Sequence, residues 1–160
     1  MTNNLDDILK IIEEEINLMN EKYHGISFLE LIKFNIIPRL STFKKKIEEI
    51  EYFENKTEMK FEKNNNKLNI SLVFNKEPKS YLKKEITQDT LYITLKGQLT
   101  IDFLEKLNKN NKTINKYPFM GVCFSSESII NLNLTKDTFF IKLINFYPNS
   151  NIEKLKKDII

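Results

Sequence analysis

The sequence predicts a mainly β protein with an N-terminal helical region, because the spacing of its apolar residues changes near residue 57. Before this point, apolar residues recur at three- and four-residue steps, as they do on one face of a helix. After it, apolar and polar residues alternate in short runs that polar turns separate at fairly even spacing, which indicates an antiparallel sandwich or barrel. We expect a helical region at 1–56 that packs on a β-barrel at 57–148, and a C-terminal tail or short helix at 149–160.

The helical region begins with an amphipathic segment at 4–22, which we expect to form the first helix. Ser27-Phe28-Leu29-Glu30 has the spacing of a capping box and predicts a short second helix. That helix should end before Pro38, because the residue before a proline disfavours helical geometry. Residues 41–53 fit a third helix in part, and the sequence leaves open whether they are helix or strand.

The β region divides into short segments bounded by turn residues. Asn64 to Asn66 form a turn signal, and Gly97-Gln98 predicts a tight link between two strands. The expected strands cover 59–62, 68–74, 81–86, 90–95, 98–104, 112–116, 121–124, 129–134 and 138–145.

The content of metal ligands restricts the possible chemistry, because the chain has one histidine, His24, and one cysteine, Cys123. One residue of each type is too few for a histidine-cluster metal site, a CxxC redox pair, a zinc finger or an intrachain disulfide. We therefore expect no metal and no cofactor. Any reaction has to depend on carboxylates, Lys, Tyr, Ser, Thr or the single Cys.

Charge and hydropathy exclude further classes of function. The net charge is +3, the lysines are spread along the chain, and Arg39 is its only arginine. Phosphate and base recognition favour clustered arginine, so we expect no nucleic acid, and a helix-turn-helix at 27–52 lacks the basic face that it would need. No apolar run is long enough for a transmembrane helix, so we expect no membrane. The N-terminus lacks the order of a signal peptide, and a single Cys suits a reducing compartment, so we expect a cytoplasmic location.

Residues 89–99, read with the strand that follows Gly97, resemble the first conserved segment of the cupin superfamily. Residues 117–144, with Pro118, Gly121 and a strand pair broken by a turn at 135–137, resemble the second segment. This layout is similar to the small single-domain cupins, including the sugar-nucleotide ketoisomerase type. The resemblance implies an antiparallel double-stranded β-helix, that is, a cupin or jelly-roll barrel, with a binding pocket inside it.

The metal ligands of the cupin superfamily are missing at the matching positions. Counting back from Gly97 puts the family's Glu at Thr90 and its two His at Lys84 and Ile86, or at Lys83 and Glu85 with the longer spacing. The third His falls near Ile130. These residues do not make the His and Glu set that holds Fe, Mn, Zn or Ni. The resemblance therefore implies the fold and the place of the pocket, without the metal chemistry.

The pocket prediction rests on the alternation of side chains along a strand. If Thr90 faces the interior, residues of the same parity should face it too, and Leu91, Ile93 and Leu95 should pack on the second sheet, on the helices or on a partner chain. Polar groups in a dry interior are costly, so such a lining should meet water or a ligand. The alternative is that these polar residues face solvent. The residues predicted to line the pocket are Lys84, Gln88, Thr90, Tyr92, Thr94, Ser128 and Ile130.

The other candidate residues have simpler structural explanations, and no catalytic residue can be named. Cys123 lies between apolar residues in a strand, which is typical of a buried side chain rather than a nucleophile. His24 next to Gly25 is typical of a helix end. Tyr92 and Lys84 would form an acid–base pair only if one cleft held both.

These observations favour a metal-free cupin-like protein that binds an unidentified small molecule in its barrel. One alternative is a metal-independent isomerase or epimerase that acts on a sugar or small acid. Another is a non-catalytic interaction protein, in which the apolar outer face at Leu91, Ile93 and Leu95 pairs two copies. We expect a homodimer in either case.

Overall fold

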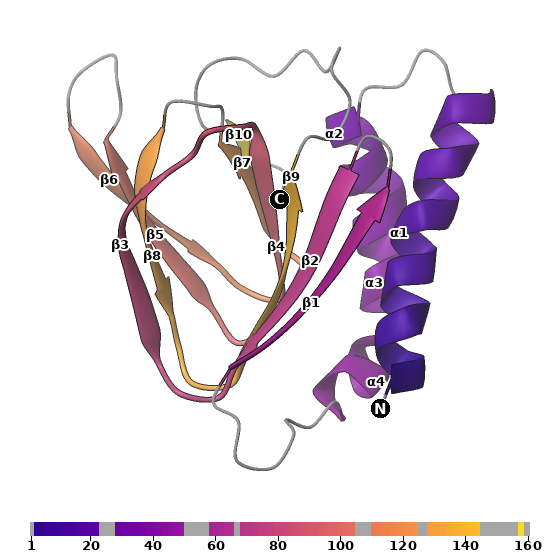
Figure 1. Ribbon diagram of the computed structural model, residues 1–160, viewed down its shortest axis with the longest axis horizontal. Coiled ribbons are helices and arrows are strands. Elements are labelled where there is room, and N and C mark those ends of the chain that lie inside the picture. The colour runs from indigo at the N-terminus through magenta and orange to yellow at the C-terminus, as the bar shows by residue number, and fades with distance from the viewer. Residues whose placement is uncertain are drawn as a thin grey trace.

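The computed structural model describes residues 2–22, 28–49, 58–65, 68–104, 110–124, 128–144 and 157–158. In this part of the chain, a layer of helices lies against the outer face of one antiparallel β-sheet, and a second antiparallel sheet faces the first from the other side (Figure 1). The predicted class, mainly β with an N-terminal helical region, is confirmed.

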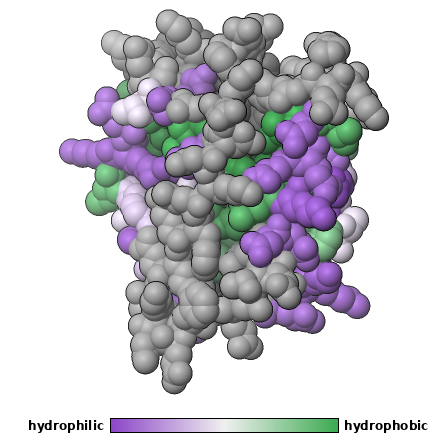
Figure 2. All heavy atoms as spheres, turned by 45° about the vertical axis from the view of Figure 1, so that its right-hand side comes forward, coloured by the Kyte–Doolittle hydropathy of each residue, from purple (hydrophilic) through white to green (hydrophobic). Residues whose placement is uncertain are grey.

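The helices share one buried side. Ile8, Ile12 and Ile16 follow one face of the first helix and are buried, as their spacing predicted. Figure 2 shows mostly hydrophilic residues on the exposed side of this helical layer. No described helix is long and apolar enough to cross a membrane. The helical elements are α1 (Thr2–Lys22), α2 (Phe28–Leu31), the π-helix η1 (Ile32–Ile36), α3 (Ile37–Ser41) and α4 (Lys44–Glu48).

The prediction that the second helix ends before Pro38 is wrong, because the helical path continues through it into α3. Pro38 has no amide hydrogen, and its ring disfavours an ordinary α-turn before it. The preceding turn is therefore widened, and the amide of Ile37 donates to the carbonyl of Ile32, five residues back. The sequence left open whether residues 41–53 are helix or strand. Their described part contains the helix α4, in which Ile47 is buried.

The strands match the predicted segments closely, with ends that coincide or differ by at most three residues. The first sheet has the order β1-β2-β9-β4-β7-β10 and the second has the order β3-β8-β5-β6. The strand pairs of the described residues do not close these sheets into one continuous barrel. The predicted C-terminal tail or helix has a strand, β10, in its described part, and β10 pairs with β7. The strands are β1 (Glu58–Asn65), β2 (Leu68–Asn75), β3 (Lys79–Glu85), β4 (Thr90–Lys96), β5 (Leu99–Leu104), β6 (Asn111–Lys116), β7 (Gly121–Phe124), β8 (Ile129–Leu134), β9 (Thr138–Ile144) and β10 (Lys157–Asp158).

Two apolar cores hold the layers together. The helix-side core lies between the helices and the first sheet and includes Ile12, Leu40, Leu91 and Ile141. The intersheet core lies between the two sheets, and its members are Val73, Ile86, Tyr92, Leu99, Ile101, Val122, Phe124, Ile130, Leu132, Leu134 and Phe140. Because the first sheet is covered on both faces, six consecutive residues of β4 are buried.

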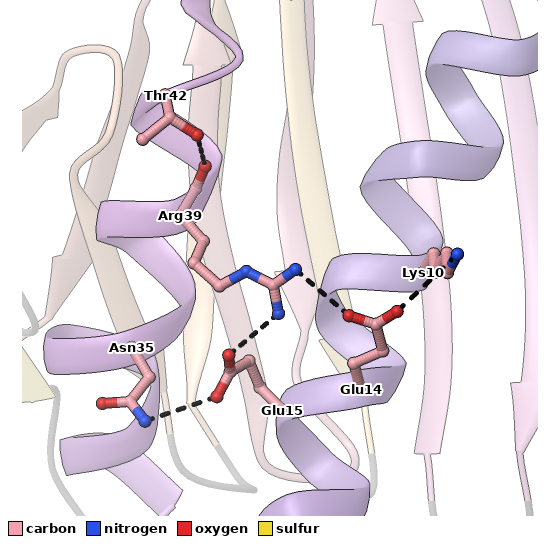
Figure 3. Close-up of polar contacts among 6 residues, drawn as sticks. All are labelled: Lys10, Glu14, Glu15, Asn35, Arg39 and Thr42. Carbon is pink, nitrogen blue, oxygen red and sulfur yellow. Dashed lines mark hydrogen bonds and ion pairs between the residues drawn. The ribbon is translucent and has the colours of Figure 1, made fainter.

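A polar cluster joins the helices above the helix-side core (Figure 3). Arg39 of α3 donates to the carboxylates of Glu15 at 2.9 Å and Glu14 at 3.1 Å, both on α1. Asn35 of η1 donates to the other oxygen of Glu15 at 3.3 Å. The hydrogen bond to Glu15 is the main cause that raises the pKa of Arg39. This cluster fixes α1 relative to η1 and α3, and so helps to keep the first sheet covered.

Candidate binding site between the sheets

The inner face of the first sheet carries several buried polar side chains. Along β4, Leu91, Ile93 and Leu95 belong to the helix-side core, whereas Tyr92 belongs to the intersheet core. Thr90 and Thr94 share the parity of Tyr92 and are also buried. The inward orientation that we predicted for these three residues of β4 is therefore what the structure shows.

Strand register places three polar residues in one row across this inner face. Lys142 on β9 is paired with Ser71 on β2 and with Tyr92 on β4. Neighbouring strands lie about 4.8 Å apart, so these three residues are immediate neighbours. Ser71 and Tyr92 are buried, and Lys142 is half-buried. We call this set the polar row.

The Tyr92 hydroxyl is the least satisfied group of the polar row. Tyr92 is 1% exposed, and its hydroxyl has no hydrogen-bond partner among the residues that the structure describes. Its ring lies 6.0 Å from the ring centroid of Phe140, inside the intersheet core. Burial raises the pKa of Tyr92 well above its usual value, so the phenol keeps its proton at neutral pH. Tyr92 therefore presents a hydrogen-bond donor to the interior.

The second sheet provides an apolar wall opposite the polar row. Ile130 on β8 and its register partner Phe103 on β5 face the intersheet core. The ring of Phe103 meets the ring of Phe124 on the first sheet edge-on, with centroids 5.6 Å apart. The two walls thus differ near the polar row, where Ile130 and Phe103 are apolar. The second sheet carries charge elsewhere, since Lys84 is opposite Ile130 in register and the buried Lys116 is opposite Leu99.

The two ends of the interior also differ. The sheets converge at the turns near residues 76–78 and 135–137, and they diverge toward the opposite end (Figure 1). At the convergent end, Thr135 and Gln98 exchange hydrogen bonds, and Thr138 donates to the carbonyl of Thr135 at 2.7 Å. The polar row lies toward the divergent end. Tyr92 and Lys142 are each two residues from the paired residues Thr90 and Ile144, which are the first residue of β4 and the last residue of β9.

The remaining residues of the predicted lining have mixed positions. Ile130 is buried in the intersheet core. Lys84 is half-buried on β3, at the edge of the second sheet and opposite Ile130 in register. Gln88 was predicted to face inward, but its side chain is exposed in the turn before β4, where strand parity does not apply. Ser128 is half-buried, and its carbonyl accepts a hydrogen bond from the amide of Ile86.

The proposed Tyr92–Lys84 acid–base pair does not form among the described contacts. The Lys84 ammonium lies 5.3 Å from the centroid of the Tyr81 ring, as in a cation–π contact. Cys123 is buried and faces the helix-side core, as expected for a structural residue. Burial, with a smaller contribution from the charge of Asp89, raises the pKa of the Cys123 thiol. His24 lies outside the described residues.

Sequence reasoning missed Ser71 and Lys142, the other two members of the polar row. Each is the polar member of an alternating segment, since Ser71 lies between Ile70 and Leu72, and Lys142 lies between Ile141 and Leu143. Such alternation is typical of a solvent-facing position, so no local signal pointed to these residues. Only the pairing of the strands shows that both residues lie next to Tyr92.

The residues at the cupin ligand positions do not fit a metal ion. Thr90 uses its hydroxyl to donate to the carbonyl of Gln88 at 2.8 Å, and Ile86 and Ile130 are apolar members of the intersheet core. Among the described residues, no group of three His, Cys, Asp or Glu side chains could hold a metal ion.

Comparison with known proteins locates the fold. No family model matches the chain, and no curated protein matches it in sequence. A cupin superfamily protein of Desulfitobacterium hafniense aligns with 63% of this chain and 87% of its own, with 20% identity and a TM-score of 0.51. The chain has the cupin fold. A second cupin-fold neighbour is named as a candidate mannose-6-phosphate isomerase of Ralstonia eutropha, and it aligns with 62% of this chain and 93% of its own, with 8% identity and a TM-score of 0.50.

The cupin fold gives the polar row its context. The match covers 63% of this chain, and the helical layer at 2–49 packs on the outer face of the first sheet. This layer covers Leu91, Ile93 and Leu95, the face through which we expected two copies to pair. The homodimer stays a prediction, now without that surface. Light scattering that finds only a monomer at high concentration would contradict it.

Proposed function

We propose that this chain binds a small organic molecule between its two sheets, beside the polar row and without a metal. The observation that carries the proposal is the Tyr92 hydroxyl, which is buried and has no hydrogen-bond partner among the described residues. An unmade hydrogen bond of this kind costs on the order of 1–3 kcal/mol, and a ligand that accepts a hydrogen bond would recover that free energy. The cupin fold supports the location, because such folds hold ligands in the mouth of a β-barrel.

Ligand-observed NMR with a defined set of small sugars, sugar phosphates, organic acids and amides tests the proposal. We expect at least one compound to bind the unmodified chain, and Tyr92→Phe to weaken that binding about tenfold or more. Tyr117→Phe is the matched control, because Tyr117 is 49% exposed and the same oxygen is removed. Binding that Tyr92→Phe leaves unchanged, or no binding by any of these classes, would overturn the proposal.

The second candidate is a metal-independent isomerase or epimerase acting on a sugar or small acid. It is favoured by one observation, the pairing of Tyr92 with Lys142, which brings a proton donor next to an amine. Burial raises the pKa of Tyr92, so the phenol stays protonated and would take the donor's role in a proton transfer, as a weak acid. Deuterium incorporation from heavy water into a bound compound would support catalysis, and binding without exchange or turnover would leave the protein as a binder.

A further inference from the structure

We propose that the molecule bound at the polar row is an amphiphilic organic acid, with its carboxylate at Tyr92 and Lys142 and its apolar part against the second sheet. This inference rests on the proposed function and adds the chemical class of the ligand. Three features of the interior lead to it: the balance of hydrogen-bond donors, the charge of the inward-facing side chains and the contrast between the two walls.

The described hydroxyl donors of the inner face are already used, except for one. Thr90 donates to the carbonyl of Gln88, and Thr94 donates to the carbonyl of Lys116 at 3.0 Å. Ser71 donates to the side-chain oxygen of Asn69 at 3.3 Å. Among the described hydroxyls of this face, Tyr92 alone is buried with its hydrogen bond unmade. A ligand at this position therefore has to bring an acceptor, such as a carbonyl or carboxylate oxygen.

Charge favours the carboxylate over the neutral carbonyl. Lys142 is paired in register with Tyr92, and Lys84 lies on the facing sheet. Register places Lys142 on the face of Tyr92 and Lys84 on the face of Ile130, so both lysines lie on inner faces. An ammonium and a phenol that converge on one oxygen make charge-assisted hydrogen bonds, which are stronger than neutral ones. Backbone register also pairs Glu62 of β1 with Ser71. A ligand acid that binds more tightly than its amide would show that the ligand meets the positive charge of Lys142.

The contrast between the walls defines the rest of the ligand. Ile130, Phe103 and Phe124 face the interior opposite or beside the polar row and offer no strong hydrogen-bonding group. A sugar would leave several hydroxyls unpaired against this wall, and each would lose its bonds to water. An alkyl or aryl group would instead remove apolar surface from water. A single polar head on an apolar body matches the interior better than a polyhydroxylated ligand does.

The experiment compares acids with their amides by calorimetry on the unmodified chain. The probes are butyrate and hexanoate, each measured against butyramide or hexanamide, which have the same shape and no charge. We expect each acid to bind about tenfold or more tightly than its amide. We expect hexanoate to bind about tenfold more tightly than butyrate, because two more methylenes are buried. These comparisons need no variant and so do not depend on how a substitution folds.

Two variants then test whether the carboxylate of the ligand binds at the polar row. Lys142→Met keeps the length of the side chain, and it should remove the preference for acid over amide. Tyr92→Phe should weaken both the acid and the amide. Lys136→Met, in an exposed turn at the convergent end, is the matched control and should change neither.

The outcomes separate this inference from the proposed function. Equal binding of acid and amide, with both weakened by Tyr92→Phe, would overturn the organic acid and leave the binding site in place. The same holds if neither probe binds while a sugar from the wider set does so through Tyr92. If none of these compounds binds, both proposals fail.

Discussion

Gly97 and Thr138 are in such close contact that a Cβ on Gly97 would lie 2.7 Å from the Thr138 Oγ1 and 2.9 Å from its Cα. Gly97 also has a φ of +77°, in the left-handed region. Its turn joins β4 to β5, which belong to different sheets. The missing side chain at Gly97 thus allows the sheets to meet at the convergent end, opposite the polar row.

Gly97→Ala should lower the free energy of unfolding by about 1–3 kcal/mol, because a Cβ meets both the strained φ and the Thr138 backbone. Urea denaturation measures the change. Lys136→Ala, an exposed substitution in the neighbouring turn, should stay within about 0.5 kcal/mol of the unmodified chain. Equal stability of the two variants would show that the contact at Gly97 relaxes freely.

Predictions from the sequence succeeded where a feature depends on residues close together in the chain. Strand positions depend on alternation within a few residues, and all the predicted segments that the structure describes are strands. The same local rule placed Thr90, Tyr92 and Thr94 on one face, since a single strand carries all three. It failed at Gln88, because the chain leaves the strand there and parity no longer applies.

The polar row could not be predicted, because it depends on pairing between segments that are distant in sequence. Ser71, Tyr92 and Lys142 become neighbours through the order β2-β9-β4 and through a register that no local pattern specifies. The widened turn before Pro38 was missed for a related reason. Local rules treat Pro38 as a helix stop, whereas burial of Ile36 and Ile37 under the first sheet stabilises a continuous path.

Tyr92→Phe should raise the free energy of unfolding of the ligand-free chain by about 1 kcal/mol, because it removes a buried hydroxyl that lacks a partner among the described residues and keeps the ring. Thermal or urea denaturation after extensive dialysis measures this. Tyr117→Phe removes the same atom from an exposed ring and should have almost no effect. A destabilised Tyr92→Phe variant would indicate that the hydroxyl is hydrogen-bonded in solution.

Arg39→Met should destabilise the chain by roughly 1–2 kcal/mol, because it leaves the carboxylate of Glu15, whose side chain is 9% exposed, without its cation. The estimate is below that for a fully buried pair, since the Arg39 side chain is 40% exposed and solvent screens it. Lys10→Met is the control, because Lys10 is 74% exposed and 3.8 Å from Glu14. A loss no greater than that of Lys10→Met would show that the cluster does not hold the helical layer.

The Cys123 thiol should make stability fall at alkaline pH. Its pKa in the folded chain is raised by burial, above the ordinary value of about 8.5 that applies when the chain is unfolded. The thiol therefore contributes its full stabilisation below about pH 8.5, and this is lost as the pH rises and the unfolded chain releases the proton. Between pH 8.5 and 10 the loss from this group should be about 1–2 kcal/mol. Denaturation of Cys123→Ala over the same range should show a shallower fall, since lysines and tyrosines titrate in both chains. Parallel pH profiles would mean that the thiol is not buried in solution.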